Sequence, residues 1–348
     1  MIKPWVFEFF PTPHEPGAAL DPQFSLDYFN WYLDLWPTAE PLGYEGIFFS
    51  EHHFGVAYSP SPNLLIAQVA PKTKTIRLGV MGIVLPYHHP WKVVEEIGML
   101  DHLTQGRLEI GTAAGIPQEM AHVGLSVAEA RERNDEAIEI LDAALAEAVV
   151  SHHGKYWSFD NLRLMPRPLQ RPTPPKWVTV VSEDSARKAA RRGAKICTGF
   201  HPIDRVTSIF DAYREEARRV GNPGGPEQLA LRRQVTLSPN DAAALDRSRA
   251  REEQFRARIM RDPRASAPGR EVFDTPNSHA FTIGSDEFIA GAPGPVADDI
   301  ITQCRACGAG HFLAIFDRSA PRVQVGDAWA MFGAEVNPIL RASASNGW

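Results

Sequence analysis

Cysteine is scarce in this chain of 348 residues, and long apolar runs and clusters of basic residues are lacking, and each of these features excludes a class of protein. The chain has three cysteines, which cannot all pair with one another, so a reducing, cytoplasmic compartment is expected. No apolar run approaches the roughly 18–20 residues that a membrane-spanning helix needs. The first residues also lack the charged and apolar regions of a signal peptide.

The formal net charge is −6, and no stripe of lysine and arginine stands out. Nucleic acid and anionic membrane surfaces are therefore not expected as partners. Hydrophobic residues make up 44% of the chain and charged residues 22%, which is typical of a globular protein. A chain of this size has enough apolar material to bury a substantial core.

The histidines and cysteines do not predict a metal site. No two histidines lie four residues apart on an expected helix with a carboxylate between them, as hydrolytic zinc sites often require. Cys304 and Cys307 have the spacing of a redox pair, but they come late in an expected helix over 296–307 that Gly308 ends. A redox pair more often opens a helix, where the dipole lowers the thiol pKa. We interpret this pair as structural.

Strand and helix patterns alternate along the chain, which favours a single-domain (β/α)8 TIM barrel over residues 1–348. A doubly wound open sheet is the alternative, but it would need a glycine-rich turn after the first strand, and 11–16 is rich in proline instead. The expected strands are 6–10, 46–50, 76–85, 107–111, 177–181, 196–198, 229–237 and 311–316. The expected helices are 24–42, 63–70, 91–103, 127–150, 184–192, 204–220, 296–307 and 328–340.

Two segments interrupt the alternation. Residues 152–176 read as a small hairpin followed by a proline-rich connector. Residues 262–295 follow the seventh strand and are long for a connection within a compact domain, so we expect a lid insertion. Barrel active sites lie at the carboxyl ends of the strands, which is where this segment begins.

The sequence Glu51-His52-His53-Phe54 follows the second expected strand at such an end. Neighbouring residues in extended backbone point to opposite sides, so one histidine can face the site while the other packs. Imidazole exchanges a proton near neutral pH because its ordinary pKa is about 6.5. A plain surface or core histidine pair is the alternative interpretation.

Residues 51–115 carry a resemblance to a known family. Glu51-His52-His53-Phe54 is followed by Leu78–Pro90, by Leu100-Asp101-His102-Leu103-Thr104-Gln105-Gly106-Arg107 and by Gly111-Thr112-Ala113-Ala114-Gly115. In this order and spacing the segment resembles the luciferase-like flavin monooxygenases, the family of bacterial luciferase. The segments 289–296 and 332–341, in the C-terminal part of the chain, also resemble this family. The resemblance implies a TIM barrel that uses reduced FMN (FMNH2), with O2 as co-substrate, to oxygenate a small organic substrate through a C4a-(hydro)peroxyflavin. It also implies a homodimer supplied by a separate flavin reductase.

The resemblance assigns roles to particular residues. It makes His52 the catalytic residue and places a non-proline cis peptide bond between Met81 and Gly82, beneath the flavin ring. The alternative at Gly82 is an ordinary strand with a bulge. Ala113 would lie beside the flavin, where luciferase has a reactive cysteine, and Ala114 replaces an arginine that contacts phosphate. Asp101, Gly106 and Arg107 are expected to be structural.

The FMN phosphate is expected at the turn from the fifth strand into its helix. There, Ser182, Glu183 and Ser185 would offer hydroxyls and backbone N–H groups, and the acidic side chains must point away. Arg131, early in the long helix, matches an arginine that reaches the same phosphate. The alternatives are a plain helix cap by Ser182 and a surface ion pair between Arg131 and Asp135.

Two other functions remain open on the same fold. One is an F420-dependent hydride-transfer oxidoreductase, and the other is a non-catalytic flavin-binding homologue. The alanines at 113 and 114 weaken any claim of light emission, which the residues do not decide. The residues do not decide between hydroxylation and Baeyer–Villiger oxidation.

Overall fold

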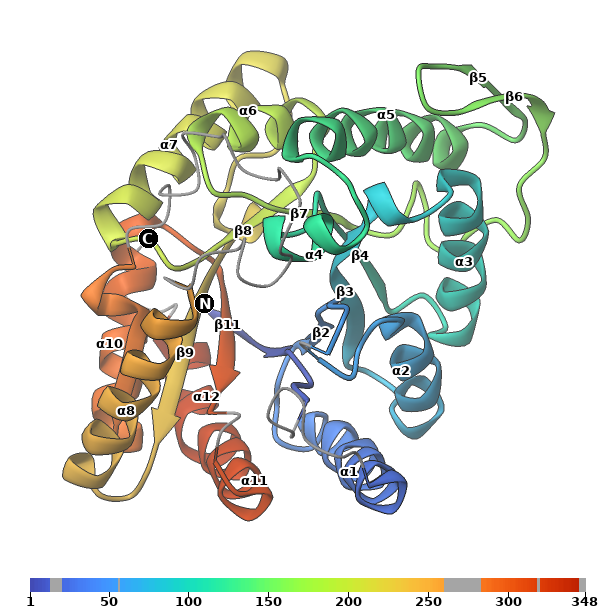
Figure 1. The fold of residues 1–348 in the computed structure, drawn as a ribbon. Helices are drawn as coiled ribbons and strands as arrows, with labels where there is room; N and C mark the ends of the chain where they lie inside the picture. The colour runs from blue at the N-terminus through green and yellow to red at the C-terminus, as the bar shows by residue number, and fades with distance from the viewer. Residues whose placement is uncertain (13–20, 56, 260–282, 318–319, 344–348) are drawn as a thin grey trace.

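Eight parallel strands close into a barrel in the computed structural model, which describes residues 1–12, 21–55, 57–259, 283–317 and 320–343 (Figure 1). The neighbours run β9-β11-β1-β2-β3-β4-β7-β8, and a further pairing of β8 with β9 closes the ring. This confirms the predicted fold class. The barrel strands are β1 (Lys3–Glu8), β2 (Gly46–Phe49), β3 (Arg77–Val84), β4 (Leu108–Ala113), β7 (Lys176–Thr179), β8 (Lys195–Thr198), β9 (Leu229–Leu237) and β11 (His311–Phe316).

Helices surround the strands (Figure 1). Proline opens several of them, at a position where its missing N–H costs nothing, and glycines in the left-handed conformation end α7 (Ile203–Val220) and α10 (Pro293–Cys307). The α-helices are α1 (Pro22–Leu35), α2 (Pro62–Val69), α3 (Pro90–Leu103), α4 (Pro117–His122), α5 (Val127–Ala146), α6 (Glu183–Arg191), α7 (Ile203–Val220), α8 (Asp241–Ile259), α10 (Pro293–Cys307), α11 (Arg322–Met331) and α12 (Asn337–Ala342). Short turns of other helix types are η1 (Trp36–Ala39), η2 (Ala70–Lys72), η3 (Leu85–Tyr87), η4 (Pro226–Gln228), η6 (Ser285–Glu287) and the π-helical η7 (Phe332–Val336).

Aromatic side chains fill the inside of the barrel. The rings of Trp5 and Phe48 stack with their centroids 4.8 Å apart, and Trp177 meets Phe48 edge-on at 5.4 Å. All three side chains are almost completely buried. Because this plug blocks the lower barrel, a ligand can enter only at the end where the strands terminate.

The structure departs from the predicted elements in several places. The helix expected over 24–42 ends at Leu35, because Pro37 follows and the chain continues as the single turn η1. The helix expected over 127–150 ends at Ala146, since Val150 begins the strand β5 (Val150–His153). β5 pairs antiparallel with β6 (Ser158–Leu162), where the sequence predicts a hairpin.

Three further elements were not predicted: the helices α4 and α8 and the short strand β10 (Phe288–Gly291), which pairs with the end of β9. Of the predicted lid over 262–295, residues 262–282 lie outside the described residues. From 285 onwards the chain forms η6, β10 and the start of α10.

The residues predicted to be structural are structural. Arg107 donates hydrogen bonds from its guanidinium to the carbonyl oxygens of Ala70 and Ile76, at 3.0 and 2.9 Å, at the lower end of the barrel. The buried carboxylate of Asp101 accepts two hydrogen bonds from Gln170 at 2.7 Å. Gly106 adopts a φ of +78°, a conformation that favours glycine.

Cys304 and Cys307 are buried free thiols in α10, and burial raises the pKa of Cys307 to about 11. A thiol with a raised pKa is a poor nucleophile, so the structural interpretation of this pair holds. Among the described helices, none has both the length and the apolar character to cross a membrane.

Candidate functional site

His52 lies just beyond the end of β2, at the open end of the barrel. Its Nδ1 atom is 2.8 Å from Oε1 of Glu119, which comes from α4 and is buried. Its ring stacks on Phe9 with the centroids 4.6 Å apart. Because Glu119 holds Nδ1, Nε2 is the ring atom through which His52 can exchange a proton.

His53 is held by a different carboxylate. Its Nε2 atom lies 3.1 Å from Oε1 of Glu51, and Nε2 of His88 lies 2.8 Å from the same oxygen. The other oxygen of Glu51 accepts the backbone N–H of Val84, at the end of β3. The two neighbouring histidines therefore separate as expected, one toward Glu119 and one toward Glu51.

The hydrogen bonds around Glu51 shift the pKa values of Glu51 and His53. Burial opposes ionisation of Glu51, but the hydrogen bonds from His53 and His88 outweigh it and lower the Glu51 pKa. The hydrogen bond to Glu51 raises the pKa of His53. The Glu51–His53 hydrogen bond thus ties the turn that carries His52 to the end of the neighbouring strand.

Glu119 is a functional candidate that the sequence interpretation missed. Its Oε1 also accepts the backbone N–H of His53 at 3.2 Å. Its Oε2 is buried and has no hydrogen-bond partner among the described residues, and the same holds for the hydroxyl of Tyr87. Burial, and then the charges of Glu119 and Glu51, raise the Tyr87 pKa. A carboxylate shortly after the fourth barrel strand was the signal that could have identified Glu119.

Met81, Gly82 and Ala113 lie on the neighbouring strands β3 and β4. The peptide bond between Met81 and Gly82 is cis, which confirms that prediction. The pairing of β3 with β4 also shifts register between Val80 and Ile83, on either side of this peptide bond. A Cβ atom on Gly82 would lie 2.5 Å from the carbonyl carbon of Thr112 and 2.8 Å from the nitrogen of Ala113. Only glycine permits this approach.

Ser182 and Ser185 form a capping box at the start of α6. Ser185 N–H donates to the Ser182 hydroxyl at 3.3 Å, and Ser182 N–H donates to the Ser185 hydroxyl at 3.2 Å. The helix cap that was the alternative interpretation is therefore formed. The carboxylate of Glu183 pairs with Arg205 on α7. A phosphate role for these residues stays a prediction.

Arg131 is exposed on the first turns of α5. The alternative partner, Asp135, pairs instead with Lys188 on α6, at 3.2 Å. This contact places α5 beside α6, and Arg131 lies one helical turn before Asp135. The helices that follow parallel barrel strands begin at the open end, so Arg131 and Ser182 lie toward the same end of the molecule.

These residues fit a planar cofactor with a phosphate tail. The Phe9 and His52 rings stack face to face, Gly82 presents backbone without a side chain near the end of β3, and Arg131 is an exposed cation on α5, the helix that contacts α6 through Asp135 and Lys188. The described residues include no group of three or more His, Cys, Asp or Glu side chains that could hold a metal ion.

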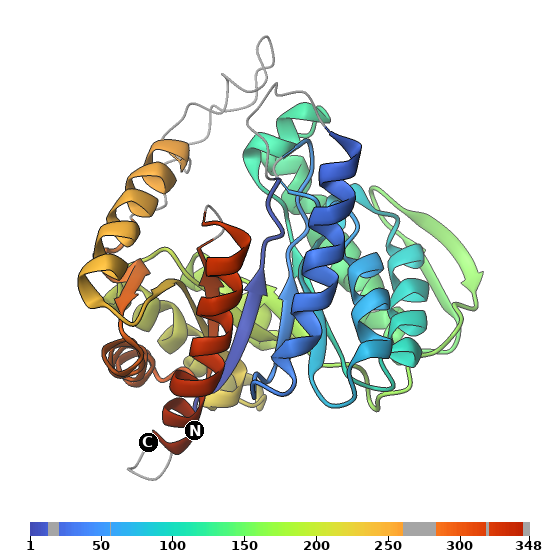
Figure 2. The ribbon, with the colours of Figure 1, turned by 90° about the horizontal axis from the view of Figure 1, so that it is seen from below.

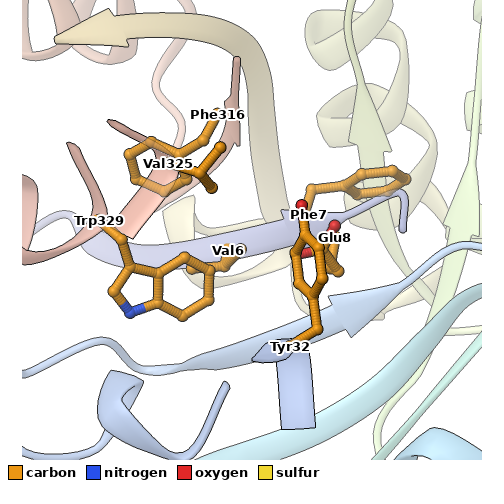
Figure 3. A pocket seen from close by; sticks show the side chains of 7 residues that line it. All are labelled: Val6, Phe7, Glu8, Tyr32, Phe316, Val325 and Trp329. Atoms are coloured by element: carbon orange, nitrogen blue, oxygen red, sulfur yellow. The ribbon is translucent and has the colours of Figure 1, made fainter. Parts of the chain in front are cut away.

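A small cavity lies elsewhere, on the outer side of β1 (Figure 3). It is bordered by Tyr32 of α1 and by Val325 and Trp329 of α11, and these two helices stand on either side of β1 (Figure 2). It has room for about one water molecule, which is too little for an organic substrate. We assign it to imperfect packing between helix and barrel.

Comparison with known proteins supports one family. A family model described as luciferase-like monooxygenase matches residues 7–301. An uncharacterized protein of Sinorhizobium fredii is 40% identical over 213 residues, 60% of each chain. The oxygenase component of the flavin-dependent trigonelline monooxygenase of Acinetobacter baylyi is 31% identical over 218 residues, 61% of this chain and 60% of that one. The matches thus span about three fifths of these relatives.

Solved structures share the fold over nearly the whole chain. The monooxygenase RslO1 from Streptomyces bottropensis has a TM-score of 0.81 at 24% identity and covers 97% of this chain and 99% of its own. The oxygenating constituent of 3,6-diketocamphane monooxygenase from Pseudomonas putida, in complex with FMN, scores 0.75 at 22% identity, with 97% and 98% covered. An F420-dependent secondary alcohol dehydrogenase scores 0.74 at 18% identity, with 98% and 99% covered. At these identities the likeness concerns the fold alone.

Proposed function

Because this chain belongs to the luciferase-like monooxygenase family, we propose that it is an FMNH2- and O2-dependent monooxygenase that acts on a small organic substrate. The observation that carries the proposal is the His52–Glu119 pair at the open end of the barrel, just beyond β2, the strand that pairs with β3. Reduced FMN would supply the activation of oxygen, which amino-acid side chains cannot perform.

In this proposal His52 holds or moves the proton of the reaction at its Nε2 atom. Glu119 fixes the ring orientation by accepting the Nδ1 hydrogen, and it stabilises the ring when it is protonated. Phe9 packs against the ring face, which keeps water from that side. Glu51 holds the backbone of the turn through His53 and Val84.

The flavin ring would lie against Met81, Gly82 and Ala113, and the phosphate would lie between Arg131 and the Ser182–Ser185 turn. The hydroxyls and the backbone N–H groups of Ser182 and Ser185 already bond within the cap, so Arg131 would provide most of the phosphate binding. We therefore expect moderate affinity. Moderate affinity suits an enzyme that receives reduced flavin from a separate reductase.

Apolar residues on α2 and α3 support a homodimer. Leu64 of α2 and Met99 and Leu103 of α3 are exposed by 69%, 54% and 52%. Exposed apolar side chains that lie close together mark interaction surfaces more often than chance. Analytical ultracentrifugation of the full chain tests this proposal, and a sedimenting monomer at micromolar concentration contradicts it.

The F420-dependent alternative is favoured by one finding, the shared fold with an F420-dependent secondary alcohol dehydrogenase. Such an enzyme would transfer a hydride and would need no O2. Its cofactor has a longer acidic tail than FMN, so the alternative requires more cationic side chains around the open end of the barrel than Arg131 alone.

Anaerobic titration followed by exposure to O2 separates these functions. FMNH2 is expected to bind more tightly than reduced F420, and bound FMNH2 is expected to reoxidise more slowly than free FMNH2, because the site excludes water. His52→Ala should slow the release of hydrogen peroxide roughly 100-fold, the usual scale for loss of a proton-transferring group, while FMNH2 affinity is unchanged. His153→Ala, at an exposed histidine of the hairpin, is the matched control.

Each outcome bears on a different part of the proposal. If FMNH2 does not bind, or if bound and free FMNH2 reoxidise alike, the monooxygenase proposal is wrong. Reduced F420 that binds and reduces a ketone would establish the alternative. Unchanged kinetics in His52→Ala would remove the role of His52 and leave the cofactor assignment standing.

A further inference from the structure

Arg232 is a buried cation in the barrel that the proposed reaction does not use. Along β9, the apolar side chains of Leu229 and Leu231 pack outward with the surrounding core, whereas Ala230 belongs to the cluster inside the barrel. Side chains alternate along a strand, so Arg232 points inward as Ala230 does. Only 7% of Arg232 is exposed.

Two aromatic rings enclose the guanidinium. Its central carbon lies 4.2 Å from the ring centroid of Phe200 and 5.0 Å from that of Phe7. A Cβ atom on Gly199 would lie 3.0 Å from its Nε, so the glycine makes room for it. Gly199 and Phe200 directly follow the end of β8, at the open end of the barrel.

No carboxylate is bonded to this cation within the described part of the chain. The Nε atom is buried and has no hydrogen-bond partner there, and no hydrogen bond or ion pair joins the guanidinium to a described residue. The nearby buried carboxylate of Glu287 is taken by Arg233, at 3.1 Å, and by the backbone N–H of Phe200, at 2.7 Å. Burial lowers the pKa of Arg232, which reflects the cost of keeping the charge there.

Aromatic contacts connect Arg232 to the candidate catalytic residue. Phe7 lies beside Arg232, the rings of Phe7 and Phe9 are 5.8 Å apart, and Phe9 stacks on His52. Arg232 therefore lies in the same aromatic lining as His52, on the opposite side of β1. An inward, unpaired guanidinium between two rings is complementary to a planar anion.

We propose that Arg232 is the anion-binding residue of this site and donates hydrogen bonds to a carboxylate carried by an aromatic substrate. Phe7 and Phe200 would contact the ring of that substrate. Calling the bound carboxylate a substrate rests on the proposed function. The binding of a carboxylate at Arg232, however, does not depend on flavin or on O2. The two can therefore fail separately.

Calorimetric titration of the full chain without flavin tests the proposal, with benzoate and nicotinate as probes and benzamide and nicotinamide as their neutral counterparts. The carboxylates are expected to bind more tightly than the amides. Arg232→Met should weaken carboxylate binding roughly tenfold or more, as for loss of a charge-assisted hydrogen bond, and leave the amides unchanged. Arg232→Lys should retain part of the affinity, because it keeps the charge and loses the planar fork.

Arg249→Met is the matched control, because Arg249 is an exposed arginine of α8. Thermal unfolding provides a second readout: Arg232→Met should melt at the same temperature as the unmodified protein or higher, since it replaces an unpaired buried charge by an apolar side chain. Equal carboxylate binding by Arg232→Met overturns the proposal, and so does a preference for the amides. A lower melting temperature shows a structural role and overturns it too. If Arg232→Met weakens FMNH2 binding and not benzoate binding, the anion bound is the cofactor, and the proposal is wrong.

Discussion

The buried ion pair between Arg233 and Glu287 should be the most sensitive point of the fold near the proposed site. Both side chains are fully buried. Arg233 donates to Glu287 at 3.1 Å and to Gln303 of α10 at 2.8 Å, and Glu287 also accepts the N–H of Phe200. The pair thereby connects β9, the residue before β10, helix α10 and the loop that carries the wall of the anion site.

The loss of unfolding free energy on substitution depends on which buried charge stays without a partner. Arg233→Met leaves Glu287 buried without its cation, a change that typically costs about 3–5 kcal/mol. Arg233→Met combined with Glu287→Leu removes both charges. The N–H of Phe200 then loses its acceptor and Oε1 of Gln303 loses its donor, as it does in Arg233→Met alone, at a cost of about 1–3 kcal/mol for each group. The double variant should therefore be more stable than Arg233→Met alone.

Urea unfolding, followed by both far-ultraviolet circular dichroism and tryptophan fluorescence, measures these differences, and coincident transitions justify a two-state treatment. Arg249→Met breaks an exposed ion pair with Asp246 and should change the free energy of unfolding by less than about 1 kcal/mol. A loss below about 1 kcal/mol in Arg233→Met would refute the reasoning. A double variant that loses the sum of the two single losses would do the same, because it would show that the two charges do not act as a unit.

Three further predictions concern other parts of the molecule. Glu119→Gln keeps a hydrogen-bond acceptor for His52 but loses the negative charge, so turnover should fall roughly 5–20-fold while FMNH2 affinity is unchanged. An equal loss of turnover and of FMNH2 affinity would indicate a structural role for Glu119. Glu40 accepts three consecutive backbone N–H groups, which overcome the effect of burial and lower its pKa from 4.5 to about 2. Its stabilising contribution is present above pH 4.5 and is lost as the pH falls toward 2, and Glu40→Gln should remove this part of the pH dependence seen in urea unfolding. Gly82→Ala should destabilise the fold by about 1–3 kcal/mol, because its Cβ would overlap the backbone of Thr112; unchanged stability would mean that β3 can move away from β4.

The sequence was sufficient for the barrel because its strands are apolar and its main helices carry a clear apolar stripe. It was not sufficient for α8, where charged residues dominate and few apolar side chains repeat at helical spacing. It also failed for β10, four residues beside a proline-rich turn, because that strand exists through its pairing with the end of β9. Local patterns cannot reveal an element that is stabilised by tertiary pairing.

In the site, too, contiguous motifs could be predicted from the sequence, whereas contacts between residues far apart in the sequence could not. His52 and the Met81–Gly82 peptide could be identified from short segments, since each motif is contiguous. The contact between His52 and Glu119 joins residues 67 positions apart, and no local pattern reports it. Likewise, the sequence shows two adjacent arginines at 232 and 233, and only the structure reveals that a carboxylate holds just one of them.

The adjacent pairs His52-His53 and Arg232-Arg233 have the same arrangement: one residue of each pair fixes the backbone, and the other faces the site. His53 and Arg233 are each bound to a buried carboxylate and so fix the backbone of a strand or strand end. Their neighbours point to the other side of the chain because extended backbone alternates. There, His52 presents Nε2 and Arg232 presents its unpaired guanidinium. His53 and Arg233 fix the backbone positions of His52 and Arg232, and a site residue needs a fixed backbone to hold its side chain in the productive geometry. Substitutions at 53 and 233 should therefore lower stability first, and substitutions at 52 and 232 should change chemistry or ligand binding first.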